Sequence, residues 1–192
     1  MSKLKVGLVG MGKRLQNQYM PIFNAFPEDF DLIGLTTKNT QSGKEKAKKH
    51  NIAHYPTLSE LNDANPDVFL ICVPANVSCD VAKDVMKFGK PIIMETPVYD
   101  GSIVQESNRL GIKFGIVEQW PFLPLEQFKR KIIDSGTLGD IFMVENDNRS
   151  YDYHGIAQLR AYLGNDSIPL RVIGSHFGCV PPDFENETGR KG

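Results

Sequence analysis

The feature that most constrains the fold is a run of six consecutive apolar residues, VFLICV, at positions 68–73. A strand that is apolar at every position is typical of the centre of a parallel sheet with helices on both faces. Shorter apolar runs flank it, and segments with helical spacing separate them. The sequence therefore predicts an α/β domain over residues 1–118, with a Rossmann-type doubly wound parallel sheet. Strands are expected at 4–9, 31–36, 68–73, 91–94 and 113–117, and helices at 15–26, 44–50, 57–62, 77–88 and 102–110.

The pattern changes after residue 118, and we expect residues 119–192 to begin an incomplete α+β second domain. Helices are predicted at 125–133 and 155–163, and strands at 141–145 and 170–176. An unfinished sheet exposes strand edges and apolar surface, both of which favour association. A homo-oligomer formed through this second sheet is the resulting expectation.

Composition argues against several classes of protein. With 22 basic and 23 acidic residues, the net charge is −1, whereas binding to nucleic-acid phosphates requires a basic excess. Apolar runs stay far below the roughly 20 residues that span a bilayer, and no signal peptide precedes the first strand. Three cysteines without a CxxC pair indicate neither a disulfide framework nor a metal site. We therefore expect a cytoplasmic protein without nucleic-acid, membrane or metal partners.

A glycine-containing turn joins the first predicted strand to the first predicted helix. Gly10 would form the tight turn, and Gly12 would let a dinucleotide pyrophosphate approach backbone N–H groups at the helix terminus. Lys13 and Arg14 lie in the same turn, and Leu15 stands where a third glycine or alanine is usual. Two glycines at a strand end also occur in loops that bind nothing. The order of strand, turn and helix favours the nucleotide site.

Residues at the end of the second predicted strand indicate whether NAD or NADP is the cofactor. An acidic residue there favours NAD by bonding the ribose 2′-hydroxyl, but this chain has Thr36, Thr37 and Lys38. Hydroxyls and an ammonium group suit the 2′-phosphate of NADP, and Arg14 would add a second positive charge. A solvated strand end that binds nothing is the simpler alternative. The prediction is NADP in preference to NAD.

The stretches VGLVGMG, PDVFLICVPANVSCDVAKDVMKFGKPIIMETPV and QWPFLPLEQFKRKIIDSGTLGDI resemble, in this order, the Gfo/Idh/MocA oxidoreductases. The resemblance extends to about Gly164. It implies a two-domain enzyme that transfers a hydride between a nicotinamide cofactor and a sugar, polyol or related small alcohol or carbonyl compound. It also implies that Glu95 lies beside the nicotinamide ribose. Further cofactor contacts implied by the resemblance are Val73, Pro74, Asn76, Thr96 and Gln119.

One residue departs from the family's Glu-Lys-Pro motif, which here is Glu95-Thr96-Pro97. The family's lysine polarises the substrate oxygen, and a threonine hydroxyl carries no positive charge. By resemblance Thr96 stands at a catalytic position, where its hydroxyl can form a hydrogen bond, and its lack of charge favours one alternative, an inactive NAD(P)-binding sensor or regulatory protein. A lyase or hydrolase with tightly held NAD is a further possibility within the family.

The resemblance also implies an acid–base pair, Asp152 and His154, just before a helix of the second domain. A histidine titrates near neutral pH and suits proton exchange with an alcohol or a ketone. The aspartate precedes the histidine by two residues rather than the more usual four. Alternatively, Asp152 caps the helix and His154 packs at its start.

Overall fold

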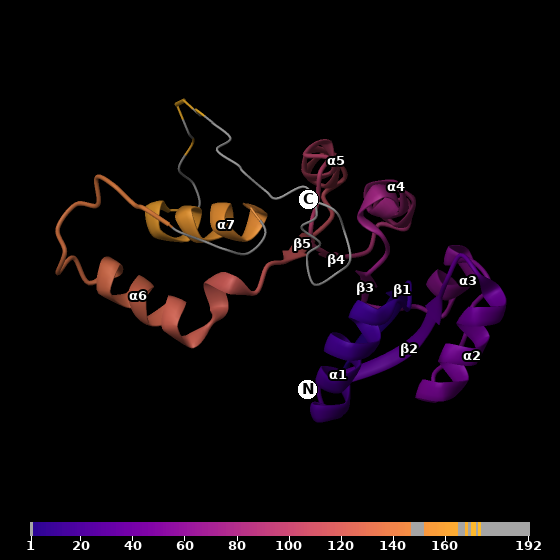
Figure 1. The fold of residues 1–192 in the computed structure, drawn as a ribbon. Coiled ribbons are helices and arrows are strands. Elements are labelled where there is room, and N and C mark those ends of the chain that lie inside the picture. Colours follow the sequence, from indigo (N-terminus) through magenta and orange to yellow (C-terminus); the bar gives the residue numbers. More distant parts are fainter. Residues whose placement is uncertain (1, 147–151, 165–167, 169, 172, 174–192) are drawn as a thin grey trace, which may run out of the picture.

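A computed structural model describes residues 2–146, 152–164, 168, 170–171 and 173 of the 192-residue chain. Five parallel strands form one sheet in the order β2-β1-β3-β4-β5 (Figure 1). This confirms the predicted doubly wound α/β fold. The strands are β1 (Leu4–Val9), β2 (Phe30–Thr36), β3 (Val68–Ile71), β4 (Ile92–Glu95) and β5 (Phe114–Val117).

Helices cover both faces of the sheet because successive strand residues point to opposite sides. In β1, Leu8 packs in one apolar layer and Val9 in the other. In β3, Leu70 and Ile71 divide in the same way. One layer is completed by η1 (Leu15–Tyr19), α1 (Met20–Ala25) and α2 (Thr40–His50), and the other by α3 (Leu58–Asp63), α4 (Ala75–Met86) and α5 (Ser102–Leu110).

Side chains at helix ends account for where the helices begin and how they run. The Asn39 side chain accepts a hydrogen bond from Ser42 N, so α2 starts four residues before the predicted position 44. Thr57 caps α3 in the same way, as its sequence pattern predicts. Pro21 has no N–H to donate, and the helical turn before it has widened to the π form of η1.

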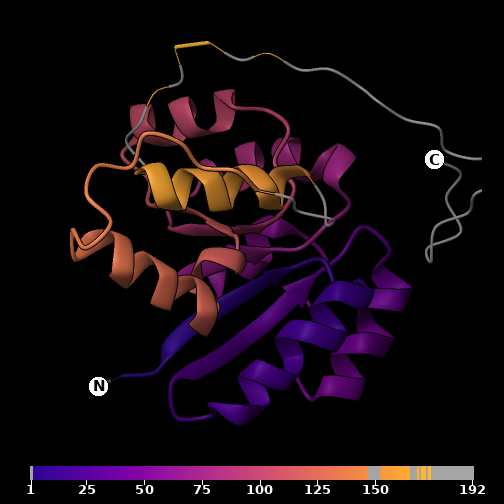
Figure 2. The ribbon, with the colours of Figure 1, turned by 60° about the vertical axis from the view of Figure 1, so that its left-hand side comes forward.

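The described residues after β5 form η2 (Trp120–Phe122), α6 (Pro124–Asp134) and α7 (Asp152–Leu163). Helices α6 and α7 lie together beside the sheet (Figures 1 and 2). Tyr162 donates to Glu126, a carboxylate on α6 that also accepts from Lys129. The bond from Tyr162 to Glu126 and a second one, from Arg130 to the Ala161 carbonyl oxygen, link the two helices.

Two predictions for this region are wrong. Residues 141–145 form no strand, because no neighbouring strand in the described part of the chain offers hydrogen-bond partners. Phe142 in this segment is 95% exposed. Helix α7 begins at Asp152 rather than after His154, so both residues belong to its first turn. The predicted strand 170–176 lies mostly outside the described residues.

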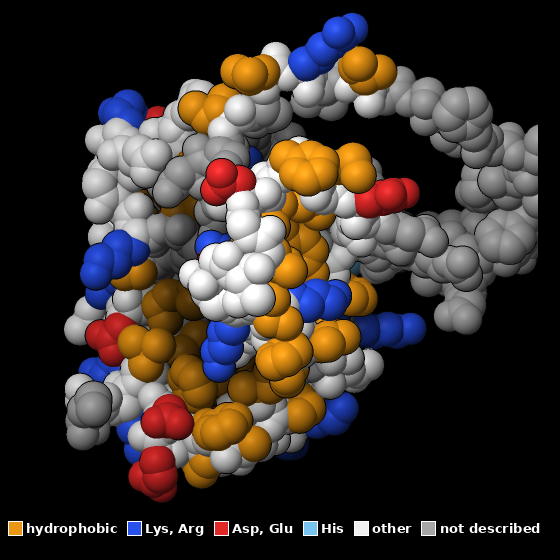
Figure 3. Space-filling view, turned by 90° about the vertical axis from the view of Figure 1, so that its left-hand side faces the viewer, with side chains coloured by type: hydrophobic (Ala, Val, Ile, Leu, Met, Phe, Trp, Pro, Cys, Tyr) orange, Lys and Arg blue, Asp and Glu red, His pale blue; other side chains and the backbone are white. Residues whose placement is uncertain are grey.

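Apolar side chains gather on the face that carries α6 and α7 (Figure 3). Those that are at least 60% exposed between η2 and residue 143 are Phe122, Leu125, Phe128, Leu138, Phe142 and Met143. None of the helices in the described ranges is both long and apolar enough to cross a membrane.

The turn after β1 needs glycine at one position and leaves open space at another. Gly10 has φ +94°, and a Cβ there would lie 2.4 Å from the carbonyl oxygen of Cys72. Its N–H donates to Thr36 O at 2.9 Å, which ties the turn to β2. A Cβ at Gly12 would meet no atom within 4 Å.

These two glycines give a matched pair of variants for stability. We expect Gly10→Ala to lower the free energy of unfolding by about 2–5 kcal/mol, from backbone strain and the clash with Cys72. Gly12→Ala should change it by less than about 1 kcal/mol. Urea denaturation followed by circular dichroism measures both, and equal losses in the two variants would contradict this account.

Candidate functional site

The order of the strands places a crevice at the carboxyl ends of β1 and β3. The chain leaves β1 towards β2 and leaves β3 towards β4 on the opposite side, and ligands bind open α/β sheets at such a switch point. Gly10 and Gly12 follow β1 here. Lys13 and Arg14 begin the helical segment that continues into η1. Leu15 is fully buried in the core, so its side chain fills the space under the turn.

This turn fits a dinucleotide pyrophosphate. Gly10 makes the sharp turn that no residue with a Cβ could make without a clash. The space in front of Gly12 is open, so a phosphate can approach the backbone there.

The end of β2 differs in part from expectation. Thr36 is buried and Thr37 donates its hydroxyl to Asn39 O at 2.8 Å, while Lys38 is exposed. A Cβ on Gly43 would lie 2.2 Å from Thr37 Oγ1 and 2.5 Å from His54 Nε2. Helix α2 therefore packs closely against the strand end. Both ring nitrogens of His54 are buried in this contact, and neither has a hydrogen-bond partner among the described residues.

Arg14 does not join Thr37 and Lys38. Its Nε donates to Glu95 Oε2 at 2.9 Å, at the end of β4, and β1 and β3 separate β4 from β2. Glu95 is only 9% exposed, and a buried carboxylate needs a counter-charge. In this arrangement Arg14 pairs with Glu95, and its contribution to binding a 2′-phosphate stays a prediction.

Two further residues donate hydrogen bonds to Glu95. The Tyr19 hydroxyl donates to Oε2 at 2.5 Å, and the N–H and hydroxyl of Thr96 each donate to Oε1 at 3.0 Å. Burial disfavours the Glu95 carboxylate, but hydrogen bonds from Arg14 and Tyr19 outweigh it and lower the pKa of Glu95. Burial and the bond to Glu95 raise the pKa of Tyr19. Glu95 is thus an ionised centre that joins the glycine turn to the Thr96-Pro97 segment.

Thr96 cannot supply the positive charge of the family's lysine. Its hydroxyl proton is donated to Glu95, so the Thr96 oxygen can accept a hydrogen bond from another group. The Thr96–Pro97 peptide bond is cis.

The remaining predicted cofactor contacts lie at neighbouring strand ends. Val73 and Pro74 follow β3, and Pro74 is the N-cap of α4, with Asn76 exposed in its first turn. Gln119 is exposed after β5 and precedes η2. All of them border the same carboxyl edge of the sheet.

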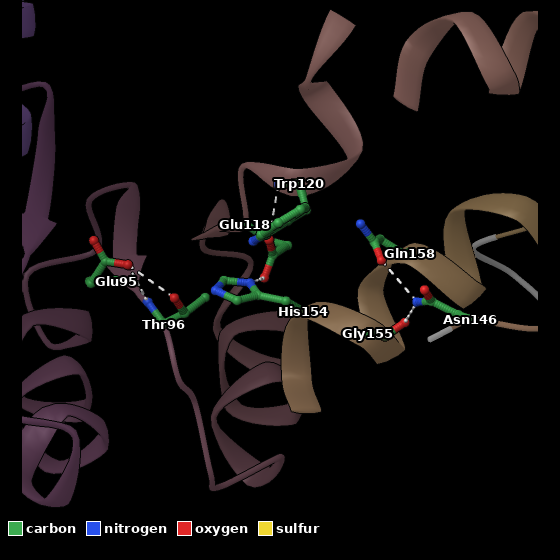
Figure 4. Close-up of polar contacts among 8 residues, drawn as sticks. All are labelled: Glu95, Thr96, Glu118, Trp120, Asn146, His154, Gly155 and Gln158. Atoms are coloured by element: carbon green, nitrogen blue, oxygen red, sulfur yellow. Dashed lines mark hydrogen bonds and ion pairs between the residues drawn. The ribbon is translucent and has the colours of Figure 1, made fainter. Parts of the chain in front are cut away.

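His154 reaches this edge from α7. In Figure 4 its imidazole lies between Thr96, after β4, and Glu118, after β5. His154 Nδ1 is 2.7 Å from Glu118 Oε2, and Glu118 Oε1 accepts a hydrogen bond from the backbone N–H of Trp120 at 3.0 Å. Only 7% of His154 is exposed, and the rings of Trp120 and Tyr153 lie 5.6 Å and 4.3 Å away.

The sequence prediction of the site includes His154 but misses Glu118. Glu118 directly precedes the predicted Gln119 at a strand end, which is the one signal that could have drawn attention to it. Asp152 lies in the first turn of α7, and its side chain is outside the described part of the structure. Within the described ranges no three His, Cys, Asp or Glu side chains group to hold a metal ion.

Comparisons with known proteins agree with this geometry. The family model described as "Oxidoreductase family, NAD-binding Rossmann fold" matches residues 4–111. The Saccharomyces cerevisiae protein YMR315W is 29% identical over 143 residues, covering 70% of this chain and 41% of the yeast protein. Galactose 1-dehydrogenase of Pseudomonas fluorescens is 29% identical over 99 residues, covering 50% of this chain and 30% of that enzyme.

A solved structure shares the fold. The WlbA dehydrogenase from Bordetella pertussis, in complex with NADH and UDP-GlcNAcA, superposes with a TM-score of 0.65 at 20% identity, covering 73% of this chain and 45% of WlbA. The chain spans less than half the length of these three proteins. The family model covers more than half of this chain, and the chain belongs to the Gfo/Idh/MocA oxidoreductase family, with its NAD-binding Rossmann fold.

Proposed function

We propose that this protein transfers a hydride between a nicotinamide cofactor and the CH–OH carbon of a sugar, polyol or related small alcohol or carbonyl compound. The observation that carries the proposal is the position of His154 at the sheet edge that also bears the glycine turn. A proton-exchanging side chain and a dinucleotide turn on one edge are the two elements that such a reaction requires. The similarity to galactose 1-dehydrogenase supports a sugar substrate.

The cofactor, when bound, accepts or supplies the hydride. The backbone at Gly10 and Gly12 binds its pyrophosphate. Thr37 and Lys38 at the end of β2 favour the 2′-phosphate of NADP, since no carboxylate occupies residues 36–38. Arg14 supports this site indirectly, by holding Glu95.

His154 accepts or donates the proton of the substrate oxygen. In the oxidation direction it accepts the hydroxyl proton of the alcohol while hydride leaves the carbon and the carbon–oxygen bond becomes a carbonyl. The protonated imidazole then returns the proton to solvent. Reduction of a carbonyl runs the same steps in reverse.

Cofactor binding is the first test. Trp120 is the single tryptophan and contacts His154 at the site, so NADPH and NADH titrations should quench its emission. We expect saturable binding that is tighter for NADPH. Gly12→Ala should weaken binding at least about 10-fold, because its methyl group occupies the space for a phosphate. Absence of binding to the folded wild-type chain would overturn the proposal.

The role of His154 is tested by His154→Asn. We expect kcat to fall about 10²- to 10⁴-fold, which is typical for loss of an acid–base group. The dissociation constant for NADPH should stay within about 2-fold of the wild type. The measurement is NADP⁺ reduction with a panel of sugars and polyols. Cofactor binding without turnover of any substrate in either direction would point instead to a nucleotide-binding sensor.

We also propose that copies of the chain associate through the exposed apolar face of the α6 region (Figure 3). Burial of such a surface is a general driving force for association. Light scattering after size exclusion should give a mass above the 21.5 kDa of one chain. A single monomer peak would refute it.

A further inference from the structure

We infer that Glu118 is the positioning residue for His154: it holds the imidazole in the tautomer that carries its proton on Nδ1, so that proton transfer falls to Nε2. The inference rests on the proposed function only for the identity of the reaction, because the tautomer itself is a property of the free protein. Neither the resemblance nor the motifs of the sequence point to this carboxylate.

Two contacts occupy the two oxygens of Glu118. Oε1 accepts the N–H of Trp120 at 3.0 Å, and Oε2 lies 2.7 Å from Nδ1 of His154. An ionised carboxylate can only accept hydrogen bonds. Nδ1 must therefore donate, and a neutral ring then has no proton on Nε2.

The surroundings make this contact a strong one. His154 is 7% exposed and the Glu118 side chain 17% exposed. The rings of Trp120 and Tyr153 flank the imidazole. Hydrogen bonds to a charged group strengthen where water is excluded, so the ring has little freedom to turn or to exchange its proton between nitrogens.

Figure 4 shows the consequence for the site. Nδ1 faces Glu118, and the ring extends towards Thr96 at the end of β4. When Nε2 accepts a proton, the ring becomes an imidazolium, and the Glu118 carboxylate at Nδ1 offsets its charge. Glu118 thus acts through His154, without contacting the reacting atoms.

The substitution Glu118→Gln separates this role from simple packing. Glutamine has nearly the same shape, but it offers one acceptor oxygen and one NH₂ donor. The Trp120 N–H still requires the acceptor. The NH₂ group then faces Nδ1, which can accept only if the proton moves to Nε2. We therefore expect E118Q to convert His154 mainly to the Nε2–H tautomer.

The readout is the ¹⁵N NMR spectrum of histidine-labelled protein at a pH at which the ring is neutral. The chain has four histidines, and the H154N spectrum identifies the resonances of His154. In the wild type, Nδ1 should resonate as a protonated nitrogen and Nε2 as an unprotonated one, and E118Q should exchange the two. With a turned-over substrate, kcat of E118Q should fall about 10²-fold or more, with the NADPH dissociation constant unchanged within about 2-fold.

Glu126→Gln is the matched control. Glu126 is also a buried carboxylate of the second region, and it bonds Tyr162 on the same helix as His154. Glutamine at this position keeps an acceptor oxygen for Tyr162 and leaves the Glu118 contact in place, so the wild-type tautomer of His154 should persist.

Each outcome decides between the two proposals. A wild-type His154 with its proton on Nε2 overturns the positioning role, whether or not the protein turns over a substrate. An E118Q protein in which the tautomer and kcat are unchanged overturns it as well. The expected tautomer exchange without turnover by any form supports the positioning role and counts against the proposed reaction alone. A tautomer change in E126Q equal to that in E118Q would also overturn the inference.

Discussion

The site depends on the hydrogen bonds and the ion pair made by the buried carboxylate of Glu95. A charge with so little access to water must be matched by hydrogen bonds and an opposite charge. Arg14 and Tyr19 come from the helical segment after the glycine turn, and Thr96 from the chain after β4. Because these donors come from both sides of the crevice, the hydrogen bonds to this one carboxylate fix the segment after the glycine turn relative to the end of β4.

The helical part of the chain is joined to the sheet by different means. Glu126 links α6 to α7 through Tyr162, and Glu118 at the end of β5 meets His154 on α7. Each contact places a carboxylate from one segment against a donor from another. Among the described residues, polar contacts of this kind and the aromatic rings beside the imidazole help to place His154.

The sheet and most of its helices could be predicted from the sequence because their signals are local. The apolar run that contains β3 and the glycines after β1 report on burial and backbone conformation at their own positions. The pairing of Arg14 with Glu95 could not be predicted, since 81 positions separate them and the demand for a counter-charge arises only after burial. The strand predicted at 141–145 is wrong for the converse reason: the apolar residues there favour a strand, but a strand also needs a neighbour to pair with. Glu118 could not be predicted as a site residue, because apart from its place beside Gln119 nothing local distinguishes it from a solvated acid.

The contact between Glu118 and His154 joins a residue of the sheet region to a residue of α7. The pair therefore exists only while α7 rests against the carboxyl edge of the sheet. The glycine turn, by contrast, is complete within the first strands and their helices. The glycine turn and the alignment of the proposed proton acceptor are thus separable in this chain: the turn is built within the Rossmann sheet, whereas the alignment of His154 also requires α7 to lie against the sheet edge.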